Sequence, residues 1–187
     1  MRSKPQRFAT ALPIMVLPQP GFLKALRELT KKSGTLLILD ETHTLSSGPG
    51  GYARAHNIVP DGLVFGKPIA GGIPAAAYGF SLDVAERIRT FLANNGDGRS
   101  GIGTTLSGSR IQLALIKTVL KEFFTQEAFA PLIALATRLE RGIADVIIKY
   151  GVPWHVVRVG ARVEFMCAPH RPNNGGEAAK IIHRPID

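Results

Sequence analysis

The sequence predicts an α/β fold, in which short strands of one sheet alternate with amphipathic helices. Short continuous apolar runs at 35–39 and 62–65 end abruptly in polar residues. This pattern is typical of strands that are buried on both faces of a helix-covered sheet. Other segments carry apolar residues at a 3.6-residue period, which indicates helices with one buried face. Hydrophobic residues make up 45% of the 187 residues, enough for a packed core.

The first half of the chain contains most of the predicted strands. A helix is expected at 21–33 because its apolar residues recur at i, i+3, i+4 and i+7, and Gly34 suits the position just past its end. Residues 42–60 are rich in glycine and are expected to form a loop. A second helix is expected at 82–92. The strands are expected at 14–17, 35–39, 62–65 and 75–80.

Two long helices are expected in the second half, with apolar residues at helical period from Ile111 to Phe123 and from Leu132 to Ile147. The sequence Gly151-Val152-Pro153 ends the second helix. Short strands around 156–157 and at 162–166 indicate a further small unit. We therefore divide the chain into residues 1–125 and residues 126–187, the second part beginning with a long linking helix.

Charge and composition limit the classes of function. The net charge of +9 and the isoelectric point near 10.1 are compatible with nucleic-acid binding. The basic residues are spread along the chain and are not interleaved with aromatic residues, so we expect no nucleic-acid partner. No apolar run approaches the length of a membrane-spanning helix, so we expect no membrane partner. The single cysteine, Cys167, permits no intrachain disulfide, which fits a cytoplasmic protein.

Asp40 and Lys67 are the candidate catalytic pair. Each lies at the end of a short apolar run, and ligands of open α/β sheets bind outside the carboxyl ends of the strands. A lysine amine forms Schiff bases with carbonyl compounds, and burial favours its neutral form. A carboxylate beside a pyridine nitrogen favours the protonated ring, which is an electron sink. The pair is therefore compatible with the chemistry of pyridoxal 5′-phosphate (PLP).

Spacing alone leaves a structural interpretation open. In that interpretation Lys67 is a surface residue between Gly66 and Pro68, and Asp40 caps the next helix. A phosphate-binding P-loop is excluded, because only three residues separate the two glycines before Lys67 where a P-loop has four. Pro68 also stands where a P-loop needs serine or threonine to bind magnesium.

Four motifs, taken in order, resemble those of class III PLP-dependent aminotransferases of the glutamate-1-semialdehyde aminomutase-like group. They are LLILDETHT at 36–44, Pro60-Asp61, FGKPIAGGIP at 65–74 and GTTLSG at 103–108. The resemblance extends from about residue 17 to about residue 180.

This resemblance implies roles for five residues. Lys67 is the lysine that forms the Schiff base with PLP, and Asp40 pairs with the pyridine nitrogen. Thr105 helps to hold the phosphate, in this family that of the neighbouring subunit, so we expect a homodimer. Thr42 stands where many members carry a valine that packs on the ring face. His43 either approaches the O3′ side of the cofactor or orients another residue, and both interpretations remain open.

The resemblance also implies part of an aspartate aminotransferase-like, PLP-dependent transferase fold. Residues 1–125 are then part of the large PLP-binding domain, and residues 126–187 are the linking helix and the start of the small α+β domain. The expected function is transamination or aminomutase chemistry, with an amino-acid or amine donor and a keto or aldehyde acceptor.

The family's N-terminal phosphate loop and ring-stacking aromatic residue have no counterpart before Asp40, so we expect a truncated chain. One alternative is therefore an inactive fragment, or a structural partner of a complementary piece. A basic nucleic-acid-binding module is the alternative from a different class.

Overall fold

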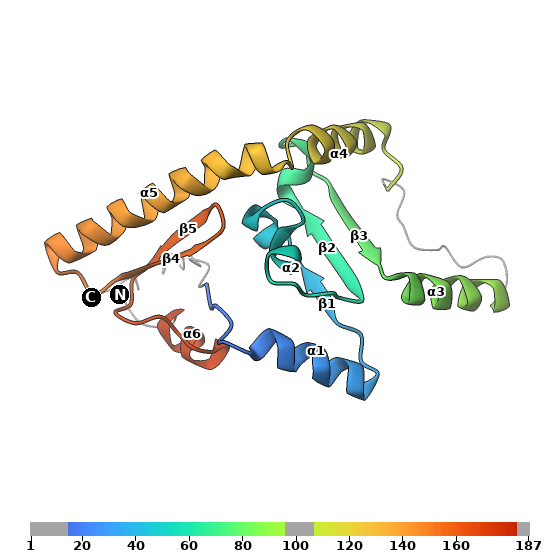
Figure 1. The fold of residues 1–187 in the computed structure, drawn as a ribbon, viewed down its shortest axis with the longest axis horizontal. Helices are drawn as coiled ribbons and strands as arrows, with labels where there is room; N and C mark the ends of the chain where they lie inside the picture. The colour runs from blue at the N-terminus through green and yellow to red at the C-terminus, as the bar shows by residue number, and fades with distance from the viewer. Residues whose placement is uncertain (1–14, 96–106, 183–187) are drawn as a thin grey trace, which may run out of the picture.

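The computed structural model describes residues 15–95 and 107–182, which build a three-stranded sheet and a separate two-stranded hairpin (Figure 1). Helices adjoin the three-stranded sheet at the ends of its strands, and one long helix runs beside the hairpin. Among the helices of these residues, none combines the length and the apolar character needed to cross a membrane.

The three-stranded sheet brings two strand ends to the same edge. Strand β1 (Ile38–Asp40) pairs in parallel with β2 (Gly62–Gly66), which pairs antiparallel with β3 (Ala76–Phe80). In this register Asp40 lies opposite Val64, so both parallel strands run out in the same direction. The link from β2 to β3 contains only η2 (Lys67–Ala70) and a short turn, too short for a parallel crossover, so β3 reverses direction.

The outer strands are less buried than the sequence predicts. The side chain of Ile38 in β1 is 54% exposed and that of Tyr78 in β3 is 49% exposed. Both strands are edges of the sheet, and the helices that precede β1 and follow β3 lie beyond the strand ends (Figure 1). The prediction that residues 35–39 form a strand buried on both faces is therefore wrong, although Leu37 itself is buried.

Helix α1 (Phe22–Ser33) is held to the sheet through one ion pair. Its end is as predicted: Gly34 takes a left-handed backbone and its N–H bonds the carbonyls of the last turn. From the middle of α1, Arg27 donates two hydrogen bonds to Asp61, of 2.6 and 2.8 Å. Asp61 also accepts from the Leu37 N–H at 2.8 Å, so this carboxylate ties α1 to the starts of β1 and β2.

Two local predictions in the first half differ from the structure. Residues 15–17 form no strand, and the prolines at 18 and 20 lack the N–H that a ladder needs. The glycine-rich stretch 42–60 contains two short helices, η1 (Thr44–Ser47) and α2 (Gly51–Ala55), because Glu41 binds the first turn of α2. The predicted helix after β3 is observed as α3 (Leu82–Asn94).

The second half follows the predicted order. Helix α4 (Arg110–Glu122) leads to α5 (Gln126–Tyr150), which ends at Gly151 in a left-handed backbone. Strands β4 (His155–Val159) and β5 (Arg162–Met166) form an antiparallel hairpin beside α5 (Figure 1). Helix α6 (Gly175–Ile182) was not predicted, because it is short and begins with two glycines. The division of the chain at residue 125 stays a prediction.

The turn of the hairpin touches the first sheet's loops through backbone atoms. The Ala161 N–H donates to the Ser46 carbonyl in η1 at 3.0 Å. A Cβ added to Gly160 would lie only 2.3 Å from the Cα of Ser47. The fold therefore brings a turn from the end of the chain against the loop that follows Asp40.

Candidate functional site

Asp40 and Lys67 leave neighbouring parallel strands at the same edge of the sheet. Asp40 is the last residue of β1, and Lys67 follows the last residue of β2. Lys67 has a φ of 52°, a left-handed backbone that costs a residue with a side chain roughly 1–3 kcal/mol and is most often kept at functional sites. Its side chain is exposed, as the structural interpretation of the sequence also expected.

The Asp40 carboxylate is oriented by the residue two positions later. Its Oδ1 accepts from the Thr42 N–H at 2.9 Å and also from the Thr42 hydroxyl. These bonds lower the pKa of Asp40 below its ordinary value, and the positive charge of Lys67 lowers it further. Asp40 is therefore ionised at neutral pH and lies within electrostatic reach of Lys67.

Asp40 does not cap the next helix, as the structural interpretation of the sequence required. Helix η1 begins after His43, and no side chain makes a capping bond to it. The carboxylate instead closes a local turn with Thr42, a common conformation for aspartate. Its second oxygen, Oδ2, accepts no hydrogen bond from the part of the chain that the structure describes.

Glu41 anchors the loop that carries Asp40. It is only 1% exposed, and its carboxylate accepts from the N–H groups of Tyr52 and Ala53, each at 2.6 Å. The Thr44 hydroxyl donates a third bond at 3.0 Å. Glu41 therefore joins α2 and η1 through three hydrogen bonds, which is a structural role.

The loops after β1 and β2 approach each other closely at Thr42 and Gly66. A Cβ added to Gly66 would lie 3.2 Å from the Thr42 Cγ2 and 3.3 Å from the Ala75 carbonyl oxygen. The Thr42 hydroxyl is engaged by Asp40 while its methyl group faces the end of β2. Thr42 thus fixes the direction of Asp40 relative to the start of the lysine loop.

His43 contacts the hairpin that comes from the end of the chain. Its Nδ1 accepts a hydrogen bond from the Arg162 Nη1. Arg162 in turn donates from Nε to the Glu164 Oε1 at 2.6 Å, and from Nη2 to the same oxygen. Loss of solvent lowers the pKa of His43, and the positive charges of Arg162 and Lys67 lower it further. Sequence reasoning missed Arg162 and Glu164, since no local motif marks them.

Four of the five predicted site residues therefore lie in one place: Asp40, Thr42, His43 and Lys67. The fifth, Thr105, lies outside the described residues.

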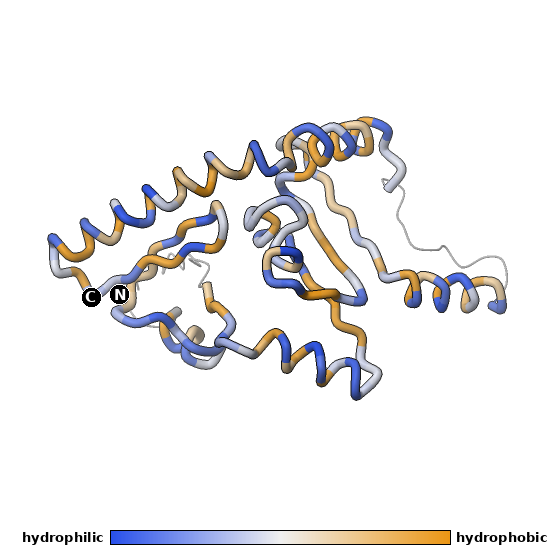
Figure 2. The backbone as a smooth tube through the Cα atoms, viewed as in Figure 1, coloured by the Kyte–Doolittle hydropathy of each residue, from blue (hydrophilic) through white to orange (hydrophobic). Residues whose placement is uncertain are grey.

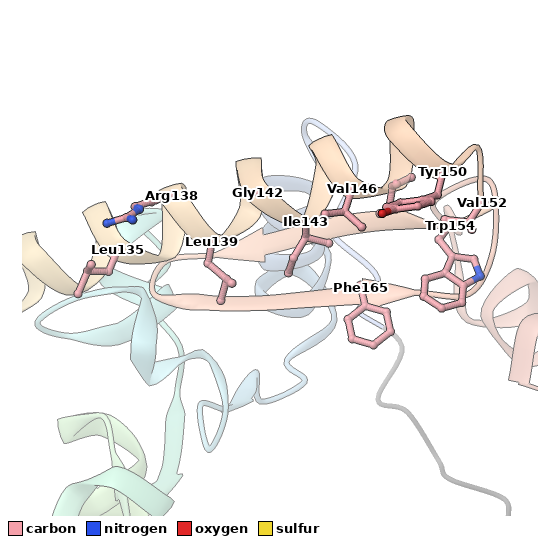
Figure 3. Close-up of a pocket in the computed structure, with 11 residues that line it drawn as sticks. Leu135, Arg138, Leu139, Gly142, Ile143, Val146, Tyr150, Val152, Trp154 and Phe165 are labelled. Atoms are coloured by element: carbon pink, nitrogen blue, oxygen red, sulfur yellow. The ribbon is translucent and has the colours of Figure 1, made fainter.

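A separate apolar groove of about 730 Å³ lies between α5 and the hairpin (Figure 3). Leu139 and Ile143 point from α5 toward the hairpin, where the rings of Trp154 and Phe165 stack 5.6 Å apart. None of the residues described along this groove is a carboxylate, a histidine or a lysine. The groove is therefore distinct from the titratable cluster at the ends of β1 and β2, and most of its lining is apolar.

The comparisons with known proteins agree with this arrangement. The model of the family "Aminotransferase class-III" matches residues 15–184. A glutamate-1-semialdehyde 2,1-aminomutase 2 from Brevibacillus brevis is 38% identical over 150 residues, which cover 80% of this chain and 34% of that protein.

Two solved structures show the same fold. A lysine-to-alanine variant of a glutamate-1-semialdehyde aminomutase from Pseudomonas aeruginosa PAO1, in complex with PMP, has a TM-score of 0.84 and 43% identity, covering 92% of this chain and 39% of that one. An omega-transaminase from Sphaerobacter thermophilus has a TM-score of 0.71 and 30% identity, covering 81% and 34% of the two chains.

The chain spans about a third of the length of the curated relatives it matches. The fold class predicted from the sequence, part of an aspartate aminotransferase-like PLP-dependent transferase fold, is confirmed by these likenesses. The family predicted from the four motifs is confirmed as well, and the chain belongs to the class III aminotransferases.

Proposed function

We propose that this chain carries the PLP-binding lysine and the pyridine-pairing aspartate of a class III aminotransferase or aminomutase. One observation supports this above the others. Asp40 and Lys67 leave adjacent parallel strands at the same edge, and the charge of Lys67 acts on the Asp40 carboxylate. Strand ends of this kind are where open α/β sheets bind their ligands.

The donor set fits PLP. Asp40 is an exposed carboxylate whose charged form is favoured by Thr42, and its Oδ2 accepts no bond from the described residues, so it is suited to a protonated pyridine nitrogen. Lys67 offers an accessible primary amine for the aldehyde of the cofactor. When bound, PLP supplies the electron sink that amino-group chemistry requires.

The residues of the chain then have separate tasks. Lys67 would hold the cofactor, and after the amino group of the substrate has displaced it, its free Nζ would take a proton from the substrate carbon and return one. Asp40 keeps the ring nitrogen protonated, and Thr42 holds Asp40 in position while lying near the ring. His43 would approach the O3′ side of the cofactor, and Thr105 would help to hold its phosphate. The proposed substrates are an amino-acid or amine donor and a keto or aldehyde acceptor, and the proposed assembly is a cytoplasmic homodimer.

Reductive labelling tests the assignment of Lys67. The purified chain is incubated with PLP at about equal concentration, reduced with borohydride, digested and mapped by mass spectrometry. We expect the pyridoxyl group on Lys67 in preference to the other lysines, and we expect this selective labelling to be lost in Lys67→Ala. Lys24→Ala is the matched control, because the Lys24 side chain is 82% exposed on α1 and lies outside the site. Equal labelling of many lysines, or an unchanged yield in Lys67→Ala, contradicts the proposal.

A second candidate function is a non-catalytic role as one piece of a larger assembly of this fold. Large apolar side chains favour it, since Leu82 is 85%, Ile148 77% and Ile111 71% exposed. Figure 2 shows hydrophobic residues along α5 and along β1 and β2. Apolar surface of this kind commonly marks an interface. A chain that sediments as a monomer and still labels selectively at Lys67 would contradict this second candidate.

A further inference from the structure

The contact between the hairpin and the loop after Asp40 gives Arg162 a specific task. We propose that Arg162 is a positioning residue that holds His43 as the neutral imidazole with its hydrogen on Nε2, leaving that N–H as a donor for a ligand of the site. The identity of the ligand atom, on the O3′ side of PLP, rests on the proposed function. The state of His43 in the free protein does not.

The hydrogen-bonding capacity of the two side chains determines the tautomer. A guanidinium group has only N–H donors and no acceptor. Because the Arg162 Nη1 bonds the His43 Nδ1, that nitrogen must be the acceptor. In a neutral imidazole the hydrogen then resides on Nε2. A protonated ring would place an N–H against an N–H and bring two positive charges together.

Arg162 is itself held in place from two sides. Its guanidinium is bound by Glu164, and the two side chains are only 23% and 16% exposed. Next to it, Ala161 bonds the Ser46 carbonyl at 3.0 Å, and the Ser46 hydroxyl bonds the His43 carbonyl at 3.0 Å. The backbones of donor and acceptor are therefore linked through one intermediate residue, Ser46.

The surrounding charges agree with a neutral His43. Arg162 and Lys67 disfavour the protonated ring, whereas Asp40 and Glu164 favour it. Loss of solvent is the largest influence and also disfavours the charge, so the pKa of His43 lies below its ordinary value. Nε2 makes no hydrogen bond with the described residues, and the His43 side chain is exposed, so the donor is available.

Nitrogen NMR of the full chain, labelled with ¹⁵N-histidine and free of PLP, tests the proposal directly. The His43 signals are assigned by their loss in His43→Gln. We expect Nδ1 to resonate as an unprotonated nitrogen and Nε2 as a protonated one at pH 7, with a titration midpoint below about 6.5, the ordinary histidine value. A hydrogen on Nδ1 in the native chain overturns the proposal whatever the variants do.

Variants separate the direct contact from general stability. Arg162→Met is expected to mix the two tautomers and to raise the His43 midpoint toward about 6.5, whereas Arg162→Lys keeps a donor and a charge and is expected to preserve part of the bias. Arg158→Met is the matched control for hairpin docking in general, because Arg158 pairs with Glu140 on α5 at 2.7 Å and donates to the Gly160 carbonyl of the turn at 2.9 Å without contacting His43. Equal effects of Arg162→Met and Arg158→Met on His43 would reduce Arg162 to a structural role and overturn the proposal. If Arg162→Met does not fold, the proposal is tested by the His43 tautomer in the native chain and by the His43 midpoint in Arg162→Lys.

Adding PLP to the same sample tests whether the His43 Nε2–H donates to the ligand. We expect the His43 Nε2 signal to move when Lys67 is labelled. A labelled Lys67 with an unmoved Nε2 overturns the assignment of the donor to the ligand. Failure of labelling with the predicted tautomer present instead contradicts only the proposed function.

Discussion

Gly160 is the point at which the hairpin and the loop after Asp40 touch most closely. Its φ is +57°, and an added Cβ would lie 2.3 Å from the Ser47 Cα and 2.5 Å from the Ser46 carbonyl oxygen. Both neighbours are backbone atoms, so no side-chain rotation relieves the overlap. Gly160→Ala must therefore move the hairpin away from η1 and break the bond from the Ala161 N–H to Ser46.

The loss of stability expected for Gly160→Ala has two parts, and substitutions at two other glycines of this chain allow them to be measured separately. A left-handed backbone costs alanine roughly 1 kcal/mol, and forcing an atom into a packed contact costs roughly 1–3 kcal/mol more, so Gly160→Ala should lose about 2–4 kcal/mol. Gly151 has a φ of +60° with open space around it, so Gly151→Ala should lose only about 1 kcal/mol. Gly142 lies inside α5 with nothing within 4 Å, so Gly142→Ala should gain about 0.5–1 kcal/mol.

Urea unfolding followed by circular dichroism measures the three free energies, and the His43 nitrogen signals report whether the hairpin is docked. Only Gly160→Ala is expected to lose the signature of an Arg162 contact. If Gly160→Ala costs no more than Gly151→Ala, the close backbone contact does not exist in solution. The reasoning that places Arg162 beside His43 would then fail with it.

Two further predictions concern Asp61 and Lys67, the residues that precede and follow β2. The Arg27 guanidinium and the Leu37 N–H lower the pKa of Asp61 to about 2. The stability that this ion pair contributes is therefore complete above the unfolded-state pKa near 3.9 and is lost as the pH falls toward 2. Asp61→Asn should remove this pH dependence when urea unfolding is compared at pH 6 and pH 2.5. At Lys67 the left-handed backbone predicts that Lys67→Gly is more stable than Lys67→Ala by about 1 kcal/mol, and equal thermal midpoints would refute this.

The elements that the sequence predicts well are those with a local physical cause. Helix α1 ends where Gly34 permits a left-handed backbone, and α5 ends at Gly151 for the same reason. The positions of Asp40 and Lys67 follow from strand ends that a few neighbouring residues define. The short helices within 42–60 could not be predicted from the sequence, because they depend on hydrogen bonds to the buried carboxylate of Glu41. A contact of this kind leaves no periodic pattern in the sequence.

The features that could not be predicted from the sequence depend on contacts between segments that are far apart in the chain. His43 and Arg162 are separated by 119 residues, and nothing in the local pattern of β5 distinguishes Arg162 from any arginine of an amphipathic strand. The exposure of Ile38 and Tyr78 was missed for a related reason. An apolar run predicts a strand, but whether helices cover that strand depends on how the whole chain packs.

Within residues 40–43, the side chains of Asp40 and His43 are held in different charge states by different neighbours. Bonds from Thr42 lower the pKa of Asp40, which keeps this acid charged at neutral pH. Loss of solvent and the cation of Arg162 lower the pKa of His43, which keeps this base neutral. One loop thus offers an anionic acceptor and a neutral donor within reach of Lys67. Because Thr42 belongs to the loop and Arg162 to the hairpin, undocking the hairpin is expected to change His43 while leaving the bonds between Thr42 and Asp40 in place.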